Sequence, residues 1–142
     1  MDEGVAASGG DRTHDLFDAL AAGDLDRFLR GCAEELVLTV SGSDPMTTLV
    51  PKSEIASWYR SMSQLAGSSF RSEVCFVLAD ERTTVVLLRH SLTRGHVDYR
   101  YETVNRVTFR DDRLASWFSH PVRRHDYARA WGIDKVPVPQ PA

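Results

Sequence analysis

Four side chains in the second half of the sequence can donate, accept or share a proton: His90, Tyr101, Asn105 and His120. A histidine titrates near neutral pH, and an asparagine amide donates hydrogen bonds at any pH. Together these types suit proton transfer beside a carbonyl group, where a base removes a proton and nearby donors stabilise the enolate oxygen. We therefore take these four residues as catalytic candidates.

The segment that presents two of them, Tyr101 and Asn105, alternates between two kinds of residue. Over 96–109, odd positions are mostly apolar or aromatic and even positions are mostly charged, which predicts a strand with one buried face. The segment 83–93 is also typical of a strand, and Arg94-Gly95 predicts a tight hairpin turn between the two. The buried face would carry tyrosines, a histidine and an asparagine among aliphatic residues, which favours a cavity lining over a closed core.

The predicted turn also sets the pairing of these two strands. With Arg94 and Gly95 in the turn, subtraction gives the pairs His90–Tyr99, Leu88–Tyr101, Val86–Thr103 and Thr84–Asn105. At ~3.3 Å per residue, His90 would lie roughly 20 Å along the sheet from Asn105. We therefore expect these two residues not to act on the same substrate atom.

Each candidate has a structural alternative. Asn105 could bond a helix terminus or a neighbouring side chain, and His120, beside Pro121, could sit at the surface. Tyr99 and Tyr101 could be wall residues with their hydroxyls at water. We also expect four further side chains to bind a ligand, although the aromatic ones could equally be packing residues: Trp58, Tyr59 and Trp117, and Met46 in a loop over the mouth.

Composition excludes several classes of function. The 142 residues, 42% of them hydrophobic, suffice for one domain with its own core. A net charge of −3 from interspersed acidic and basic residues predicts no nucleic-acid partner. Apolar runs are too short to span a membrane and no export signal is evident, so we expect a cytoplasmic protein. The histidines lack metal-ligand spacing, the serines lack a triad pattern, and Cys32 and Cys75 are expected to be ordinary thiols.

The composition of its two ends divides the chain into two tails and a single domain. Residues 1–11 are expected to be a disordered tail, 12–132 the domain, and 133–142 a Pro-rich tail. Within the domain we predict helices from Thr13 to Gly23, from Asp24 onward and from Pro51 to Gly67, and a last helical turn or two before Gly132. Strands are expected at 36–40, 69–78, 83–93, 96–109 and 114–120, with a loop at 41–49. This order predicts an α+β fold with helices on one side of a curved, mostly antiparallel sheet.

Three segments carry a resemblance to a known family: Ala-Ala-Gly-Asp-Leu-Asp at 21–26, Leu-Val-Leu-Thr-Val-Ser-Gly at 36–42 and Phe-Arg-Asp-Asp-Arg-Leu-Ala at 109–115. With the order of elements, they resemble the SnoaL-like polyketide cyclases and ketosteroid isomerases of the nuclear transport factor 2-like superfamily, over residues 16–131. The resemblance implies a cone-shaped, cystatin-like fold whose sheet wraps a pocket capped by helices. It also implies a homodimer through the outer face of the sheet, where Val85, Leu87 and Val104 are expected to lie.

The resemblance transfers few of the family's functional residues unchanged. The general-base aspartate of ketosteroid isomerases falls on Thr39, their oxyanion tyrosine on Leu16 and their oxyanion aspartate on Asn105. The histidine and aspartate of SnoaL-like cyclases fall on Asn105 and Ser119. Of these, only Asn105 keeps a suitable donor, and we place Thr39, Leu16 and Ser119 among the ligand-binding residues with Tyr99.

The function implied by the resemblance is cofactor-free proton transfer in secondary metabolism, an isomerase, cyclase or dehydratase reaction on an apolar or polyketide-like molecule. Asn105 and Tyr101 would stabilise the enolate oxygen, and His90 or His120 would be the base. One alternative is an epoxide hydrolase of the limonene-epoxide-hydrolase type, although Asp98 and Arg100 are predicted to face outward. The other is a non-catalytic ligand-binding or accessory protein. Expected partners are the small apolar substrate and a second copy of the chain, and no membrane.

Overall fold

The computed structural model describes residues 9–43, 46–80 and 83–132 of the chain. Its elements run α1 (Gly9–Ala21), α2 (Leu25–Arg30), β1 (Val37–Ser43), β2 (Met46–Pro51), α3 (Lys52–Leu65), β3 (Arg71–Ala79), β4 (Thr84–Arg94), β5 (Val97–Arg110), β6 (Arg113–Pro121) and α4 (Arg124–Trp131). The expected α+β class is confirmed. None of the helices in these three ranges has the length and apolar character needed to cross a bilayer.

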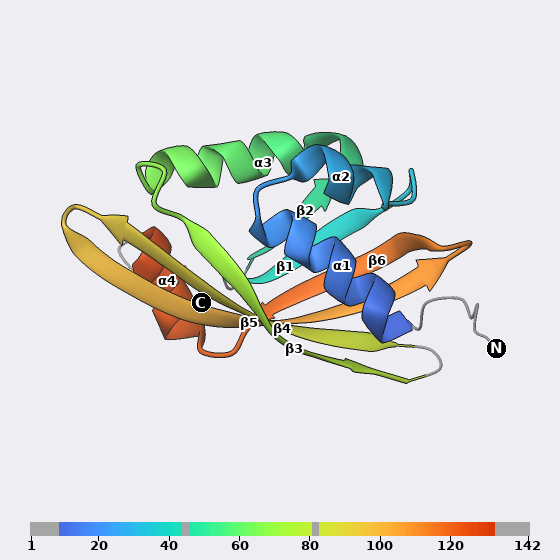
Figure 1. Cartoon of the computed structure of the whole chain (residues 1–142). Coiled ribbons are helices and arrows are strands. Elements are labelled where there is room, and N and C mark those ends of the chain that lie inside the picture. Colours follow the sequence, from blue (N-terminus) through green and yellow to red (C-terminus); the bar gives the residue numbers. More distant parts are fainter. Residues whose placement is uncertain (1–8, 44–45, 81–82, 133–142) are drawn as a thin grey trace, which may run out of the picture.

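The six strands form one curved sheet in the order β2-β1-β6-β5-β4-β3. Every neighbouring pair is antiparallel except β1 and β6, which run parallel. Figure 1 shows α1, α2 and α3 together on one side of the sheet, with α4 near the end that carries the β4–β5 hairpin. The long strands β4 and β5 therefore connect the part of the sheet under the N-terminal helices to the part beside α4.

The alternation of β5 is confirmed, and its pairing with β4 differs from the prediction by two residues. The turn consists of Gly95 and His96, both with positive φ (+58° and +67°), and Arg94 pairs with Val97. Two positive φ values suit a tight hairpin turn whose twist matches that of the strands. Because the turn lies one residue later than expected, every partner number changes by two, and each side chain keeps its predicted face.

Two predicted boundaries were wrong. Helix α1 begins at Gly9, so it takes in the end of the expected N-terminal tail, and Thr13 is a buried residue inside the helix instead of its cap. The expected loop at 41–49 contains the end of β1 and the start of β2. The Gly, Ser, Asp and Pro residues there indicated a long loop, but the apolar and β-branched residues up to Val50 extend a strand that pairs with β1.

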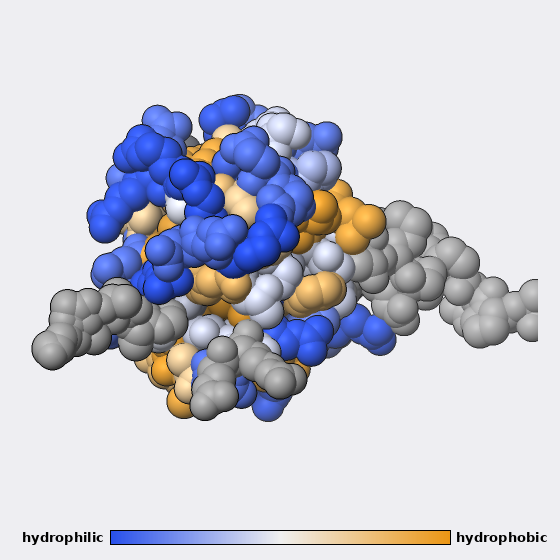
Figure 2. Space-filling view, turned by 90° about the vertical axis from the view of Figure 1, so that its right-hand side faces the viewer, coloured by the Kyte–Doolittle hydropathy of each residue, from blue (hydrophilic) through white to orange (hydrophobic). Residues whose placement is uncertain are grey.

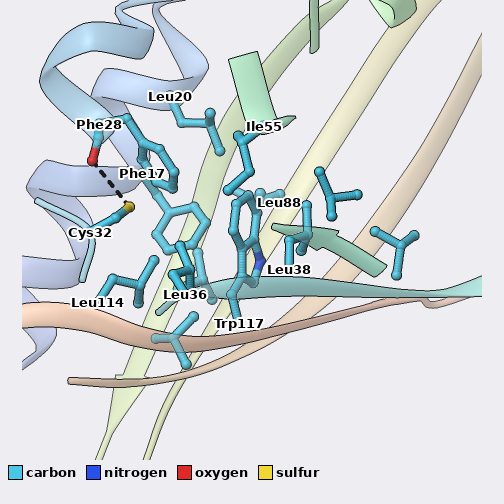
Figure 3. Packing of buried hydrophobic residues seen from close by; sticks show 14 residues of the cluster. Phe17, Leu20, Phe28, Cys32, Leu36, Leu38, Ile55, Leu88, Leu114 and Trp117 are labelled. Atoms are coloured by element: carbon cyan, nitrogen blue, oxygen red, sulfur yellow. Dashed lines mark hydrogen bonds between the residues drawn. The ribbon is translucent and has the colours of Figure 1, made fainter. Parts of the chain in front are cut away.

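The main core lies between the helices and the sheet. Phe17 of α1, Phe28 of α2 and Trp117 of β6 meet edge to face, with ring centroids 5.2–5.7 Å apart (Figure 3). Each such buried ring contributes on the order of 2 kcal/mol through burial alone. Cys32 is buried in this core and donates to the Phe28 carbonyl at 3.3 Å, and burial raises the pKa of its thiol to about 12.

A second, smaller cluster lies toward the β4–β5 hairpin. It contains Leu92, Tyr101, Ala66 and Ala130, with Tyr127 packed against both clusters. The inner face of the sheet is thus covered by α1, α2 and α3 over one part and by α4 over another. The polar residues of interest lie between these two apolar regions.

Candidate functional site

A small cavity of about 20 Å³ lies between α3, α4 and the inner face of the sheet. This volume holds about one water molecule. Its polar lining residues are His90, Tyr101, Thr103, Asn105 and Ser119, joined by the half-buried Tyr59. The remaining lining is apolar and aromatic, and it includes Trp58, Phe70, Trp117 and Tyr127.

A chain of hydrogen bonds runs along this lining. The Trp117 indole donates to Asn105 Oδ1 at 2.8 Å, and Asn105 Nδ2 donates to Thr103 Oγ1 at 2.9 Å. Thr103 Oγ1 lies 2.9 Å from His90 Nε2, and His90 Nδ1 lies 2.7 Å from Ser72 Oγ. Because an indole N–H can only donate, it fixes which side of the Asn105 amide is oxygen and so sets the direction of the chain.

Asn105 is fully buried, and its amide hydrogens are directed at protein atoms. Besides Thr103 Oγ1, the amide nitrogen lies 3.3 Å from the Val86 carbonyl and 3.2 Å from the Thr103 carbonyl. The alternative in which this amide bonds neighbouring groups is the one that the structure adopts. Asn105 therefore orients Thr103 and Trp117, and has no hydrogen left over for an oxyanion in this arrangement.

His90 is held between two aromatic rings at 4% exposure. Its imidazole is nearly parallel to Phe70, at 5.6 Å between centroids, and stacks on Tyr101 at 4.6 Å. Loss of solvent lowers the pKa of His90 to about 3, so the ring is neutral at neutral pH. If the Thr103 hydroxyl donates to Nε2, then His90 donates its Nδ1–H to Ser72 Oγ. The Thr103 hydroxyl hydrogen and the imidazole N–H are then both hydrogen-bonded.

Tyr101 places a phenol beside this imidazole. It is 4% exposed, and its oxygen accepts a hydrogen bond from the Trp131 indole of α4 at 3.0 Å. Burial raises the pKa of Tyr101 well above its usual range, so the hydroxyl stays protonated. Since it accepts from Trp131, its own hydrogen remains for another acceptor.

Seven of the residues predicted for the site line the cavity: Trp58, Tyr59, His90, Tyr101, Asn105, Trp117 and Ser119. The predicted separation of His90 from Asn105 was wrong, because in the observed register Val86 pairs with Asn105 and His90 with Tyr101. Both side chains bond the same Thr103 hydroxyl.

Four other predicted residues lie elsewhere, and we correct them here. His120 is exposed on the outer face and bonds Ser41 Oγ at 2.6 Å. Thr39 also faces outward, since Leu38 and Val40 on either side of it line the cavity. Tyr99 packs in the cluster near the hairpin, under the Arg94 guanidinium at 5.4 Å.

Leu16 does not reach the cavity either. It packs at the edge of the main core, close over Gly31. The side chain of Met46 lies outside the described residues.

The sequence predictions missed Ser72, Thr103 and Phe70 as parts of this site. Thr103 shares the odd-numbered face of β5 with Tyr101 and Asn105, so the alternation contained the signal. Ser72 pairs with His90 across β3 and β4. That register depends on a bulge between Val74 and Phe76, which no local pattern indicates.

Acidic residues are absent from the described cavity lining. Asp98 is exposed and accepts a hydrogen bond from Thr93 at 2.7 Å, and Arg100 is exposed, as predicted for both. The water-activating carboxylates of a limonene-epoxide-hydrolase site therefore have no counterpart here. Within the three described ranges, no group of three or more His, Cys, Asp or Glu side chains gathers as a metal site would require.

Comparison with known proteins places this geometry in a family. The model of the SnoaL-like domain matches residues 13–117. The chain belongs to the SnoaL-like family. A search of curated protein sequences gave no significant match. The resemblance inferred from the sequence is therefore confirmed at the level of the family.

Several solved structures share the fold of this SnoaL-like protein. Bal32a, from a soil-derived mobile gene cassette, has a TM-score of 0.76 at 14% identity, covering 84% of this chain and 93% of its own. A cystatin-like protein from Xanthomonas campestris has a TM-score of 0.73 at 13% identity, covering 85% and 95%. IdmH from Streptomyces antibioticus, described as a polyketide cyclase candidate, has a TM-score of 0.68 at 14% identity, covering 84% and 96%. At these identities the likeness shows the fold alone.

Proposed function

We propose that this protein catalyses proton transfer beside a carbonyl group of a small apolar, polyketide-like molecule in secondary metabolism, leading to isomerisation, cyclisation or dehydration. The observation that carries the proposal is the neutral imidazole of His90, which lines the cavity and is buried between Phe70 and Tyr101. The family and the polyketide cyclase candidate among the structural neighbours support the same class of reaction.

In the proposed mechanism His90 is the base. A neutral imidazole carries a lone pair on one nitrogen, and the hydrogen bonds at both nitrogens hold the ring in one orientation. The substrate would displace the hydroxyl that donates to this lone pair before the ring takes its proton. The Tyr101 hydroxyl would donate to the developing enolate oxygen, because its phenol remains protonated and already accepts from Trp131. Asn105 is a positioning residue in this scheme, since it acts through Thr103.

The rest of the lining supports an apolar substrate. The side chains of Trp58, Tyr59, Tyr127 and Trp117 present aromatic surface to the same space, and no charged group among the described residues lines it. A neutral, flat molecule would therefore bind with little cost of desolvation once the lining side chains move apart to widen this space.

Deuterium exchange at the α-carbon of a 1,3-diketone tests this proposal without knowledge of the natural substrate. Acetylacetone and benzoylacetone would be incubated with the protein in D2O and followed by proton NMR. We expect the parent to accelerate exchange and His90→Gln to lower the acceleration about 100-fold or more. His120→Gln, which alters the histidine on the outer face, should leave it unchanged. Equal rates for His90→Gln and the parent would refute the role of His90.

A second candidate function is ligand binding without turnover. The internally satisfied amide of Asn105 favours it, because that group offers no hydrogen to an oxyanion. Diketones that shift the amide resonances of residues around His90 while their exchange rate equals that of buffer would support this candidate over catalysis.

A further inference from the structure

A second space lies on the other side of two aromatic rings of the cavity wall. It is a surface groove of about 230 Å³ between the end of α1, the start of α2, α3 and the first residues of β3. Its larger apolar and aromatic lining residues are Leu20, Leu25, Tyr59 and Phe70. Its volume is more than ten times that of the cavity around His90.

The groove and the cavity share part of their lining. Tyr59 and Phe70 border both spaces, with their ring centroids 6.4 Å apart. Ser72 borders the groove, and its hydroxyl lies 2.7 Å from Nδ1 of His90. A molecule in the groove is therefore separated from His90 by one serine hydroxyl and the Phe70 ring.

Polar groups of α3 lie along the rim of the groove. Arg60 and Ser63 are three residues apart on the helix, so they occupy one face, and both line the groove. Arg60 is exposed, and among the described residues no carboxylate lines this groove with it. A groove lined by both a guanidinium and apolar side chains is suited to a ligand that combines a flat ring with an acidic oxygen.

We propose that this groove is the outer half of the ligand site and binds a flat aromatic or enolic ring that carries an acidic oxygen. The ring lies against Tyr59 and Phe70, and the oxygen is bound by Arg60 and Ser63. This inference rests on the proposed function for the reaction that follows binding, but the binding itself requires no turnover. Ser72 is then the contact through which the bound ring reaches His90.

Equilibrium binding of 1-hydroxy-2-naphthoate, compared with 2-naphthol, tests the groove. We expect the naphthoate to bind the parent, and Arg60→Gln to weaken its binding about fivefold to tenfold while binding of 2-naphthol changes little. Arg129→Gln removes an exposed arginine from α4 and should have no effect on either compound. Ser63→Trp fills the groove and should abolish binding of both, with circular dichroism used to check that the variant is folded.

Amide shifts in NMR spectra locate the bound naphthoate. Shifts at Gly23, Leu25, Ser63 and Ser72 support the proposal. Equal affinity of the parent and Arg60→Gln, or shifts confined to the outer face of the sheet, would overturn it. Naphthoate binding in the groove with no diketone exchange would leave the groove established and refute catalysis, whereas exchange that persists in Ser63→Trp would refute the groove and leave the role of His90 intact.

Discussion

Asn105 links the chemistry of the site to the stability of the fold. Its oxygen accepts from Trp117 and its nitrogen donates to Thr103, so it connects a core aromatic residue to the partner of His90. All three neighbours are buried. The Asn105 amide pairs both the Trp117 N–H and the Thr103 hydroxyl. An apolar side chain at this position would leave these two buried groups without that hydrogen-bond partner.

Substitution of Asn105 by alanine should therefore destabilise the protein. We expect the free energy of unfolding to fall by about 2–4 kcal/mol, because the Trp117 N–H loses its acceptor and a small cavity forms. Urea denaturation followed by tryptophan fluorescence measures the change. Thr39→Ala, on the outer face, should change the same quantity by less than about 0.5 kcal/mol. An unaltered midpoint for Asn105→Ala would show that these hydrogen bonds do not stabilise the fold.

Burial of His90 makes stability depend on pH in a defined direction. Its pKa is about 3 in the folded protein, against an ordinary value of 6.5 for histidine, so between these pH values the unfolded chain binds more protons. The stabilisation is complete above pH 6.5 and is lost as the pH falls toward 3. Between pH 7 and pH 5 we expect a loss of about 2 kcal/mol, and His90→Gln should remove most of this dependence. A parent whose urea midpoint is constant from pH 7 to pH 5 would contradict this burial.

The sequence predicted which face these residues occupy but not what they contact. Alternation along β5 placed Tyr101 and Asn105 on the inner face, and that held because a register error of two residues preserves the face. The contact between His90 and Thr103 required the register itself, which depends on which two residues form the turn. Local sequence gives Gly95 a role in the turn without deciding whether Arg94 or His96 accompanies it.

At the scale of elements, α4 closes the site at its hairpin end. Tyr127 lines the cavity, and Trp131 donates to the Tyr101 hydroxyl. Arg94 at the end of β4 donates to the Ala130 and Arg129 carbonyls at 2.7 and 3.3 Å. Last-turn carbonyls of a helix have no partner within it, so a guanidinium from another element fixes that end in place.

Loss of these two attachments should loosen α4 selectively. In the double variant Arg94→Gln with Trp131→Phe, amides of residues 127–131 should exchange with deuterium at least about tenfold faster, since three hydrogen bonds of roughly 1 kcal/mol each are lost or weakened. Amides in the middle of β5 should exchange as in the parent. Arg129→Gln is the matched control, because Arg129 contributes only its main-chain carbonyl to these hydrogen bonds and the substitution keeps that carbonyl. Uniform acceleration over β5 and α4 would show that the helix has no independent opening.

Element boundaries were predictable where one signal dominated. The start of α2 after Asp24 and the bounds of α3 between Pro51 and Gly67 follow from residues that sequence rules interpret directly. Strand β2 was missed because its turn residues lie next to a short strand. The parallel pairing of β1 with β6 joins segments about 80 residues apart. This contact was not predicted, because periodicity indicates which face a residue occupies and not which strand lies beside it.

At the scale of the whole molecule, the outer face of the sheet carries an apolar patch beside the ion-paired residues Glu73, Arg89 and Glu102. Phe76 and Leu78 are 46% and 62% exposed, and they pair with Leu87 and Val85, which share that face. Val104 continues the surface onto β5. Figure 2 shows mostly hydrophilic residues over the upper part of this side of the molecule, with hydrophobic residues at the surface along its right edge and at its lower end. A contiguous apolar face of this kind favours association.

We propose that two copies of the chain associate through this face, and Leu78→Glu should separate them. In a twofold interface each substituted carboxylate faces the same surface of the other copy, so two charges are buried or repel and the dissociation constant rises by at least about 100-fold. Sedimentation velocity should show the parent near twice 15.9 kDa and the variant near 15.9 kDa. Leu65→Glu is the matched control, because Leu65 is 65% exposed at the end of α3, on the helical side of the molecule. If the parent sediments as a single chain at all concentrations, or if Leu65→Glu separates the copies as well as Leu78→Glu does, the outer face is not the interface, and its apolar residues need another explanation.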